Sequence, residues 1–508
     1  MIEKQKIKKI LIPNRGEISI RVQRTCRELG IPAVAVFSEP DRLALHVRYA
    51  DEAYFLPGTT PRETYLNQEQ IFEIARLSGA DAIHPGYGFL SENAEFARAC
   101  QERGLIFIGP PPEAMALMGL KTGSRRVMEE VGVPVVPGTE PLESAEEAAE
   151  QADKIGYPIL IKASAGGGGK GMRLVETPVS MESAFEACRR EAQAAFGDPR
   201  VYIEKYLLKP RHVEFQVLAD LYGHTIHLYE RECSVQRRHQ KIIEETPSLI
   251  LTEDMRRRMG AVAVEAARAC GYTNAGTVEF LVDSERNFYF LEMNTRLQVE
   301  HPITEMITGL DLVERQIRIA EGEPLSEEIV PRRGAAMECR IYAEDPNDNF
   351  LPSPGLIKGL NDPGGPGVRN DSGVYAGYTI PMEYDPMISK LVVYGENRQQ
   401  VLGRMLRALE EYHIMGIRTN IPFLRKILAH PLFISGDYDT QFISRYQQDL
   451  LQGEMESPHT ESVALAAAAI LQFLHGQPHQ KNVDLATTKW ISAWKLAGRI
   501  HSHGSICQ

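Results

Sequence analysis

The hydrophobic and polar positions at the start of the chain alternate between short apolar runs and longer amphipathic segments. Residues 8–13 and 33–37 are apolar runs of strand length, and residues 18–29 between them have the spacing of a helix that ends at Gly30. Residues 71–77 continue the pattern with a further helix. This order predicts a parallel sheet with helices on its faces, and such sheets bind ligands at the carboxyl ends of their strands.

A glycine-rich loop follows the apolar residues that end at His84. Residues 84–93 read His-Pro-Gly-Tyr-Gly-Phe-Leu-Ser-Glu-Asn. The position of the loop, at the end of a predicted strand, suits a ligand site, but a purely structural turn is an equal alternative on position alone.

Residues 135–206 predict a small α+β unit with a glycine run at its tip. Helices are expected at 145–155 and 181–196, and strands flank the run Gly166–Gly169. Gly166, Gly168 and Gly171 formally satisfy GxGxxG, but that pattern binds a dinucleotide only where it opens a helix, and here a strand follows. Adjacent glycines expose backbone N–H groups, and Lys162 stands just before them. A mobile cover over phosphates is therefore favoured over a flexible loop without function.

Residues 276–282 and 287–294 predict two strands joined by a tight turn. Alternation of side chains along a strand places Glu279 on one face of the first strand, and Glu292 and Asn294 on one face of the second. Two carboxylates and an amide oxygen suit a Mg²⁺ or Mn²⁺ ion that bridges nucleotide phosphates. A purely structural role for these acids requires a nearby cation that the local sequence does not supply.

Polar and charged residues are unusually dense directly after this strand. A core strand does not tolerate so many unpaired charges, yet the apolar start of the segment drives it into the interior. We therefore predict a metal–nucleotide site beside an anion site. The segment from Leu291 to Glu305 contains Glu292, Asn294, Arg296, Gln298, Glu300, His301 and Glu305.

A basic stretch and the end of the chain allow more than one interpretation. Residues 231–241 hold five basic side chains, which form either an anion pocket beside the phosphate site or a solvated face. After a linker at 451–459, an apolar stripe at 463–474 precedes Trp490 and Trp494. These residues dock onto a partner or cap the preceding domain.

Length, charge and cysteine usage narrow the class of protein. A chain of 508 residues suggests two to four domains, and its net charge of −12 argues against nucleic-acid binding, which needs a basic footprint. No apolar run approaches the roughly 18 residues of a membrane span, and the first residues lack a signal-peptide core. The seven cysteines are scattered without a CxxC pair, which favours reduced thiols over disulfides or a cysteine-rich zinc site. We expect a cytoplasmic protein.

Several long motifs occur together in an order that resembles the biotin carboxylase family, within the ATP-grasp superfamily. The likeness runs in unbroken order from residue 6 to residue 447, so coincidence does not explain it. The central motif reads Glu-Met-Asn-Thr-Arg-Leu-Gln-Val-Glu-His-Pro. The matching segments are 14–17, 84–93, 162–172, 204–206, 210–214, 236–241, 292–302 and 338–340.

The resemblance implies an α/β and α+β multidomain fold. It implies a Rossmann-like N-terminal domain at 1–120, linker helices and a mobile ATP-grasp lid at 121–206, and an ATP-grasp core at 207–335. A biotin carboxylase C-terminal domain is expected at 336–450, with 451–508 as a tail extension.

The resemblance also implies a reaction and roles for individual residues. The reaction is ATP-dependent carboxylation of biotin by bicarbonate through carboxyphosphate, with Glu300 as the base. Glu279, Glu292 and Asn294 are implied as ligands of Mg²⁺ or Mn²⁺. The residues implied to hold bicarbonate are Lys241, Arg296, Gln298 and Val299. The resemblance implies that Arg340 stabilises the biotin enolate and that Tyr87 lies near the biotin. ATP binding is implied for Lys121, Lys162, Gly166, Gly167, Gly168, Gly169, Met172, Glu204, Lys205, Leu207, His212, Gln236, His239 and Leu281.

Two departures bear on partners. Lys170 stands where many relatives carry arginine, which keeps the charge. Single-chain carboxylases carry an Ala-Met-Lys-Met biotin-attachment site, and this sequence does not contain one. We therefore expect a subunit, as a homodimer, that acts on the biotin of a separate biotin carboxyl carrier protein and works with carboxyltransferase subunits. The final acceptor (acetyl-CoA, propionyl-CoA or pyruvate) stays open.

Two other functions fit parts of the pattern. Another ATP-grasp ligase, such as a carbamoyl-phosphate synthetase domain, is disfavoured by the segments 84–93 and 338–340. A non-catalytic nucleotide-binding subunit is disfavoured because both proposed metal acids, Glu279 and Glu292, are present.

Overall fold

The N-terminal part contains the predicted parallel sheet, in the strand order β3-β2-β1-β4-β5. The computed structural model describes residues 4–119, 121–164, 171–326 and 329–451. Leu11 and Val34 are buried in the sheet, and the loop 84–93 leaves the carboxyl end of its fourth strand. The strands are β1 (Ile10–Ile12), β2 (Ala33–Phe37), β3 (Glu52–Phe55), β4 (Ala82–Ile83) and β5 (Ile106–Phe107), and the main helices are α1 (Gly16–Glu28), α3 (Gln68–Ser78) and α4 (Ala94–Glu102).

A three-stranded antiparallel sheet with its own hydrophobic core follows, after helices α5 (Pro112–Gly119) and α6 (Lys121–Glu130). The predicted hairpin around the glycine run is confirmed, since Lys162 pairs with Met172 across it. Gly166–Gly169 themselves lie outside the described residues. The elements are β6 (Ile159–Ala163), β7 (Met172–Val175), β8 (Val201–Lys205), α7 (Ala145–Ile155) and α8 (Met181–Phe196).

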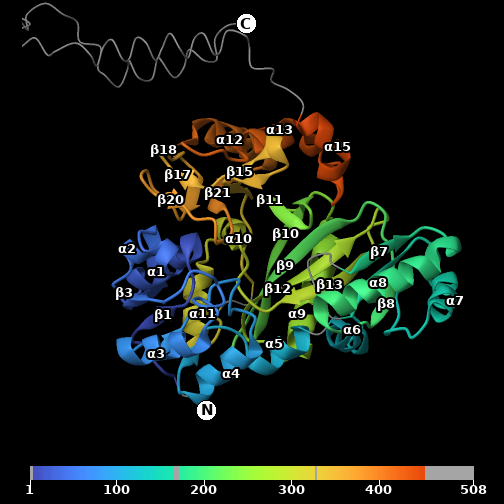
Figure 1. The fold of residues 1–508 in the computed structure, drawn as a ribbon, viewed down its shortest axis with the longest axis horizontal. Coiled ribbons are helices and arrows are strands. Elements are labelled where there is room, and N and C mark those ends of the chain that lie inside the picture. The colour runs from blue at the N-terminus through green and yellow to red at the C-terminus, as the bar shows by residue number, and fades with distance from the viewer. Residues whose placement is uncertain (1–3, 120, 165–170, 327–328, 452–508) are drawn as a thin grey trace, which may run out of the picture. The chain divides into compact units, whose positions relative to one another are not determined.

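An eight-stranded sheet forms the centre of the described chain, in the order β13-β12-β9-β10-β11-β14-β21-β19. It runs without interruption from the predicted hairpin to the last third of the chain, and the α+β part of the predicted fold is confirmed (Figure 1). The strands are β9 (Arg211–Ala219), β10 (Thr225–Arg237), β11 (Gln240–Thr246), β12 (Asn274–Val282), β13 (Phe288–Asn294), β14 (Ala335–Tyr342), β19 (Val368–Ser372) and β21 (Met387–Gly395).

Helices cover this sheet and complete two hydrophobic cores, one that includes residues of α9 and one that includes residues of α12 and α13. Helix α9 packs on β9, β10 and β12. Helix α10 lies on β14 and β21, where Ile303 and Ile307 contact Ala336 and Val392. The helices of this part are α9 (Glu253–Ala269), α10 (His301–Thr308), α11 (Leu312–Ala320), α12 (Arg398–Glu411), α13 (Ile421–Ala429) and α15 (Phe442–Leu451). The apolar stripe at 463–474, Trp490 and Trp494 lie outside the described residues.

The basic stretch 231–241 differs from the sequence expectation. Most of the stretch is strand, since β10 continues to Arg237 and β11 begins at Gln240. Arg231 is buried inside this strand because it bonds to side chains of neighbouring strands instead of water. The sequence did not reveal this burial, since a charged side chain normally indicates a solvent-exposed position.

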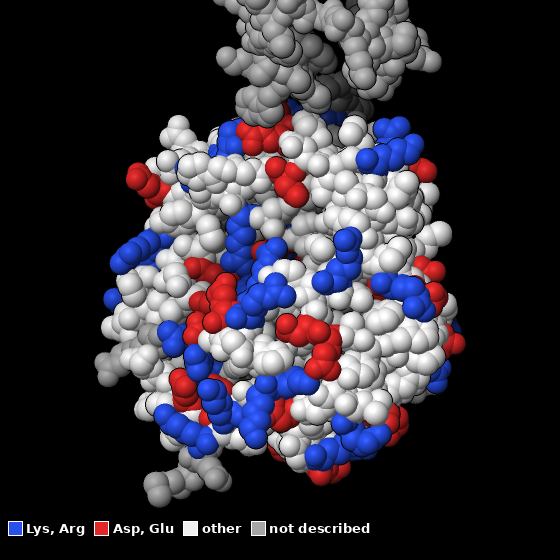
Figure 2. All heavy atoms as spheres, turned by 90° about the vertical axis from the view of Figure 1, so that its left-hand side faces the viewer, with Lys and Arg blue, Asp and Glu red and all other residues white. Residues whose placement is uncertain are grey.

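The described surface carries charges of both signs. On the face drawn in Figure 2, acidic and basic side chains are interspersed in small groups. None of the described helices combines the length and the apolar surface needed to span a lipid bilayer.

Candidate active site

Two cavities meet at the end of the hairpin β12–β13. The larger has a volume of about 600 Å³ and the smaller about 490 Å³. Arg296, Val299 and Arg340 line both, and Tyr87 lines the smaller. The larger cavity brings together the following predicted residues: Lys162, Met172, Glu204, Lys205, Leu207, His212, Gln236, His239, Lys241, Glu279, Leu281, Glu292, Asn294, Arg296, Gln298, Val299, Glu300 and Arg340.

The hairpin places the predicted metal acids side by side. Glu279 is the cross-strand partner of Glu292, directly before a shift in the register of the two strands. The Glu279 carboxylate accepts hydrogen bonds from Asn294 Nδ2 at 2.8 Å and from Gln298 Nε2 at 2.7 Å. The alternation argument therefore predicted the convergence of these side chains correctly.

A positive charge close to the proposed metal acids, which the local sequence did not supply, is provided by Lys241. Its Nζ lies 2.5 Å from Glu214 Oε2, 2.8 Å from Glu279 Oε1 and 2.8 Å from Glu300 Oε1. Burial alone lowers the pKa of Lys241, but the three carboxylates outweigh it and raise that pKa well above its ordinary value. Lys241 therefore stays charged and joins the proposed metal acids to the proposed base.

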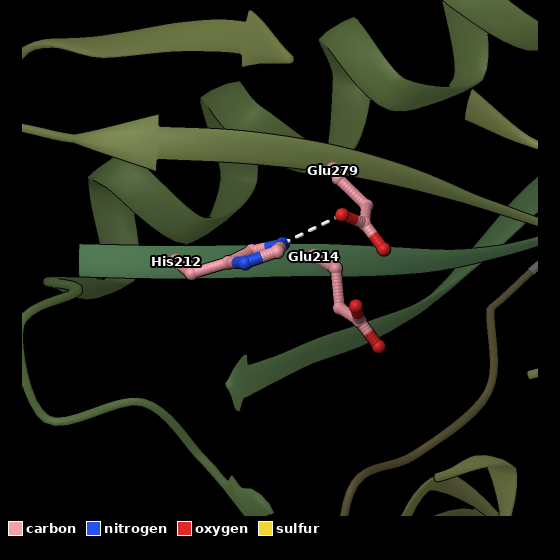
Figure 3. Close-up of side chains that lie close together, drawn as sticks. All are labelled: His212, Glu214 and Glu279. Carbon is pink, nitrogen blue, oxygen red and sulfur yellow. Dashed lines mark ion pairs between the residues drawn. The ribbon is translucent and has the colours of Figure 1, made fainter. Parts of the chain in front are cut away.

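A histidine adds a second positive partner to Glu279. His212 Nε2 lies 2.7 Å from Glu279 Oε2, and Figure 3 shows that the two side chains point toward one another from adjacent strands, with Glu214 beside them. Burial opposes protonation of His212, but the Glu279 carboxylate outweighs it and the pKa of His212 is raised. Burial also opposes ionisation of Glu279, yet Lys241 and His212 hold its pKa well below the usual range.

The donor set fits a divalent cation. Ligand atoms of His212, Glu214 and Glu279 lie within 4.8 Å of one another, and Glu292 lines the same cavity. Carboxylate oxygens are the ligands that Mg²⁺ and Mn²⁺ prefer. Asn294 presents its Nδ2 to Glu279 and its Oδ1 to Arg296 Nη2 at 3.1 Å, so its amide oxygen faces the neighbouring guanidinium in this structure.

Glu300, the residue before α10, lines the larger cavity beside Arg340, which lines both cavities. It is 2% exposed and lies 2.8 Å from Lys241 Nζ and 3.0 Å from Arg340 Nη2. Burial favours its neutral form, but Lys241, Arg340 and Arg231 outweigh burial and hold the pKa of Glu300 well below its usual range. An ionised, buried carboxylate at this point can accept a proton from a small acid held between the cavities.

Arg296 and Gln298 complete the anion-facing wall. Arg296 Nε donates to Glu92 Oε2 at 3.0 Å, which ties the wall to the loop 84–93. Gln298 Oε1 accepts a hydrogen bond from Arg231 Nη2 at 2.5 Å, and Gln298 Nε2 donates a hydrogen bond to Glu279. Hydrogen bonds at both ends fix the orientation of the Gln298 amide.

The predicted nucleotide residues lie on several elements around the larger cavity. Lys162 Nζ lies 2.5 Å from Glu204 Oε2, across the paired strands β6 and β8. Gln236 Nε2 lies 2.7 Å from His212 Nδ1. Lys205 Nζ donates to the carbonyl of Gly156 at 2.8 Å. Lys121 begins helix α6, and its side chain lies outside the described part of the chain.

The basic stretch does not form a single anion pocket. Lys241 and His239 line the larger cavity, but Arg237 pairs with Glu344 at 2.6 Å. Arg231 is enclosed by five hydrogen-bond partners, because its guanidinium has five N–H donors to satisfy. These partners are Glu214, Gln216, Thr277, Gln298 and Thr304.

Glu305, part of the dense polar segment, does not reach the site. It pairs with Arg21 at 2.8 Å and Arg369 at 2.7 Å, and its carboxylate also accepts the backbone N–H of Leu312. The helix α10 that begins after Glu300 turns Glu305 away from the cavities. Glu305 therefore belongs to the dense polar segment by sequence but lies outside the site, and no role there was assigned to it.

Sequence reasoning did not place Glu214, Arg231 or Glu244 at the site, although each touches a proposed site residue. Glu214 and Arg231 form a buried ion pair at 2.6 Å beneath Lys241 and Gln298. Glu244 accepts Arg340 Nε at 2.7 Å. Glu214 lies in a family-like motif, but only the paired strands of the folded sheet bring it to Lys241.

Comparisons with known proteins identify the family to which the chain belongs. Residues 6–115 match the family model of the biotin carboxylase N-terminal domain, 121–328 that of the carbamoyl-phosphate synthase L chain ATP-binding domain, and 338–445 that of the biotin carboxylase C-terminal domain. The chain is 54% identical over 444 residues to biotin carboxylase 1 of Bacillus subtilis, covering 87% of this chain and 99% of the relative. It is 54% identical over 441 residues to the biotin carboxylase of a Nostoc species, covering 86% and 99%.

A solved structure extends the likeness to the fold. The biotin carboxylase domain dimer of the 2-oxoglutarate carboxylase from Hydrogenobacter thermophilus, in complex with MgADP, ADP and bicarbonate, matches with a TM-score of 0.84 and 48% identity. The match covers 89% of this chain and all of that chain. The fold and the two joined cavities define an ATP-grasp ligase. More specifically, the chain belongs to the biotin carboxylase family. The predicted family, fold and enzyme class are confirmed, and the carbamoyl-phosphate synthetase alternative is not favoured.

Proposed function

We propose that the protein carboxylates biotin at its ureido N1, using ATP and bicarbonate, and releases ADP and phosphate. The observation that carries this proposal is the position of Glu300, an ionised carboxylate that lines the larger cavity 3.0 Å from Arg340, which lines both cavities. One cavity has the nucleotide and metal residues, and the other has room for the bicyclic ring of biotin. Because Arg296, Val299 and Arg340 line both cavities, a reagent formed in the first has only a short distance to travel to the second.

The bicarbonate half of the reaction uses Glu300 as a general base. Bicarbonate is a weak nucleophile until its proton is removed, so a carboxylate within hydrogen-bond reach accelerates its attack on the γ-phosphate. Lys241, Arg296 and the Gln298 amide hold the anion, together with the backbone of Val299. Bond formation between a bicarbonate oxygen and phosphorus releases ADP and gives carboxyphosphate.

The nucleotide half is held by the acids of the hairpin and by the three-stranded unit. Glu279 and Glu292, with Asn294 after rotation of its amide, would hold Mg²⁺ or Mn²⁺, and this ion neutralises phosphate charge when bound. Lys162 meets the phosphates, and exclusion of water from this part of the cavity protects carboxyphosphate from hydrolysis. The other nucleotide contacts are those implied by the family motifs.

The biotin half uses Arg340. Carboxyphosphate breaks down to CO₂ and phosphate, and the phosphate takes the N1 proton of biotin. The charge that develops on the ureido oxygen requires a fixed cation, and the Arg340 guanidinium is oriented by Glu244 at 2.7 Å and Glu300 at 3.0 Å. Tyr87 lines the same smaller cavity and would lie near the ring of biotin.

Partners follow from the reaction. The substrate is biotin attached to a biotin carboxyl carrier protein, and a carboxyltransferase passes the carboxyl group to the final acceptor. Relatives include chains of a pyruvate carboxylase and of a methylcrotonoyl-CoA carboxylase, so this site does not determine the acceptor. We propose that the protein is a homodimer in the cytoplasm. We also propose that the chain is divided into structural units at 1–120, 121–206, 207–335 and 336–450.

Free biotin provides a direct test. Purified protein with MgATP and bicarbonate is expected to release phosphate, and saturating free biotin is expected to accelerate the release. Omission of bicarbonate should abolish it, and ammonia should not replace it. Phosphate release that ignores both bicarbonate and biotin would overturn the proposal, and release that depends on ammonia would indicate a carbamoyl-phosphate synthetase reaction instead.

A further inference from the structure

A fully buried lysine, Lys390, lies behind the junction of the two cavities. It is on β21 and is 0% exposed. Its Nζ donates a hydrogen bond to the Val299 carbonyl at 2.9 Å and lies 3.2 Å from Glu17 Oε2. It also lies 5.6 Å from the centre of the Tyr87 ring. The lysine thereby joins residues that are far apart in the sequence and that all line the cavities.

Burial of this ammonium group is costly, and its surroundings offset only part of the cost. Glu17 is 5% exposed and lines the smaller cavity, and besides Lys390 its carboxylate has no hydrogen-bond partner among the described residues. Asp371, the cross-strand partner of Lys390, is already bonded to Arg369 at 2.7 Å. A methionine of similar length fills the same space without a charge to bury, so a specific task for the ammonium group is indicated.

The carbonyl that Lys390 binds belongs to the peptide between Val299 and Glu300. That peptide fixes the direction in which the Glu300 side chain leaves the backbone. The preceding carbonyl, of Gln298, is held by His301 Nδ1 at 2.8 Å. The peptide planes on both sides of Val299 are thus anchored, one of them by Lys390 alone among the described side chains.

We propose that Lys390 is a positioning residue for bicarbonate activation, which it serves by anchoring the Val299–Glu300 peptide. It touches neither nucleotide nor bicarbonate and acts through the backbone. The inference rests on the proposed role of Glu300 as the base.

The test separates this role from simple structural support. In Lys390→Met the anchor is lost, but Glu17 is left buried without its cation. The double variant Lys390→Met/Glu17→Gln removes both charges of the pair and therefore relieves that penalty. Arg256→Met breaks a buried pair with Glu230 that lines neither cavity and serves as the control for loss of a buried cation. Bicarbonate-dependent ATP hydrolysis is measured without biotin, and melting temperatures are measured in parallel.

A positioning role predicts that KM for bicarbonate rises or kcat falls by about ten-fold or more in both Lys390 variants, while KM for MgATP stays within about two-fold. Arg256→Met should change melting temperature only. A double variant with wild-type bicarbonate kinetics would overturn the proposal, as would failure of both Lys390 variants to fold, because the residue is then structural. If wild-type hydrolysis ignores bicarbonate, the proposed function itself fails, and this outcome is distinct from either result.

Discussion

Lys241 Nζ lies 2.8 Å from Glu300 Oε1 and, at the same distance, from Glu279 Oε1. One ammonium group therefore joins the proposed metal acid to the proposed base. A change of charge at either carboxylate alters the electrostatic energy of the other carboxylate, because the three groups are buried together.

Loss of the Lys241 charge should destabilise the protein. Lys241→Met leaves Glu214, Glu279 and Glu300 close together without their common cation, and removal of one partner from a buried ion pair costs about 3–5 kcal/mol. The free energy of unfolding, measured by urea denaturation at neutral pH, should fall by this order. Lys9→Met removes a partly exposed lysine, with 24% of its side chain accessible, from its pair with Glu52 and should cost no more than about 1 kcal/mol. Equal losses in the two variants would contradict the account.

Glu300→Gln should separate binding from chemistry. Glutamine keeps the shape of the side chain but cannot accept a proton, so turnover should fall by about two to four decades, as for loss of a general base. Binding of ADP, followed by calorimetry, should be nearly unchanged, because the nucleotide residues lie elsewhere in the larger cavity. Full activity in this variant would remove Glu300 from the role of base.

The hairpin was predictable from the sequence, whereas its counter-charges were not. Strand alternation placed Glu279 and Glu292 together, since both residues lie on adjacent strands with a short turn between them. Lys241 reaches Glu279 only because β11, β10, β9 and β12 are neighbours in the sheet, and no local pattern encodes that order. Long-range pairing therefore decides which cation balances the acids.

Buried charges were the main reason for the remaining differences. Arg231 and Lys390 are fully buried, although an isolated arginine or lysine in a sequence normally indicates solvent. Their partners come from strands that are distant in the sequence, so the local sequence does not indicate that these two side chains are buried. Glu305 shows the converse, because it belongs to the polar segment by sequence but pairs with Arg21 and Arg369 outside the cavities.

The metal requirement should depend on Glu292. Glu292→Gln removes one negative ligand, so the Mg²⁺ concentration that gives half-maximal phosphate release should rise by about ten-fold or more, as for disruption of a metal site. Glu285→Gln removes one negative charge from the exposed turn of the same hairpin and is the matched control. An identical Mg²⁺ dependence in the two variants would exclude Glu292 from the metal site.

Glu17 should make stability depend on pH. Burial raises its pKa to about 7, although Lys390 and Arg369 act in the opposite direction. The folded state therefore binds more protons than the unfolded state between the ordinary glutamate pKa and pH 7, and stability falls as pH rises through this interval. Glu17→Gln removes the effect, so its stability relative to the wild type should increase by about 2–3 kcal/mol between pH 5 and pH 8. Urea denaturation at both values checks the sign, and a constant difference would contradict it.

The central claim is that bicarbonate, activated by Glu300, attacks the γ-phosphate of ATP in the cavity beside the biotin site. The most direct measurement is a reaction with bicarbonate labelled with heavy oxygen, followed by mass spectrometry of the released phosphate. Because a bicarbonate oxygen becomes bonded to phosphorus and stays there when carboxyphosphate breaks down, one labelled oxygen should appear in each phosphate. Phosphate that carries no label, with carboxybiotin still formed, would contradict the account.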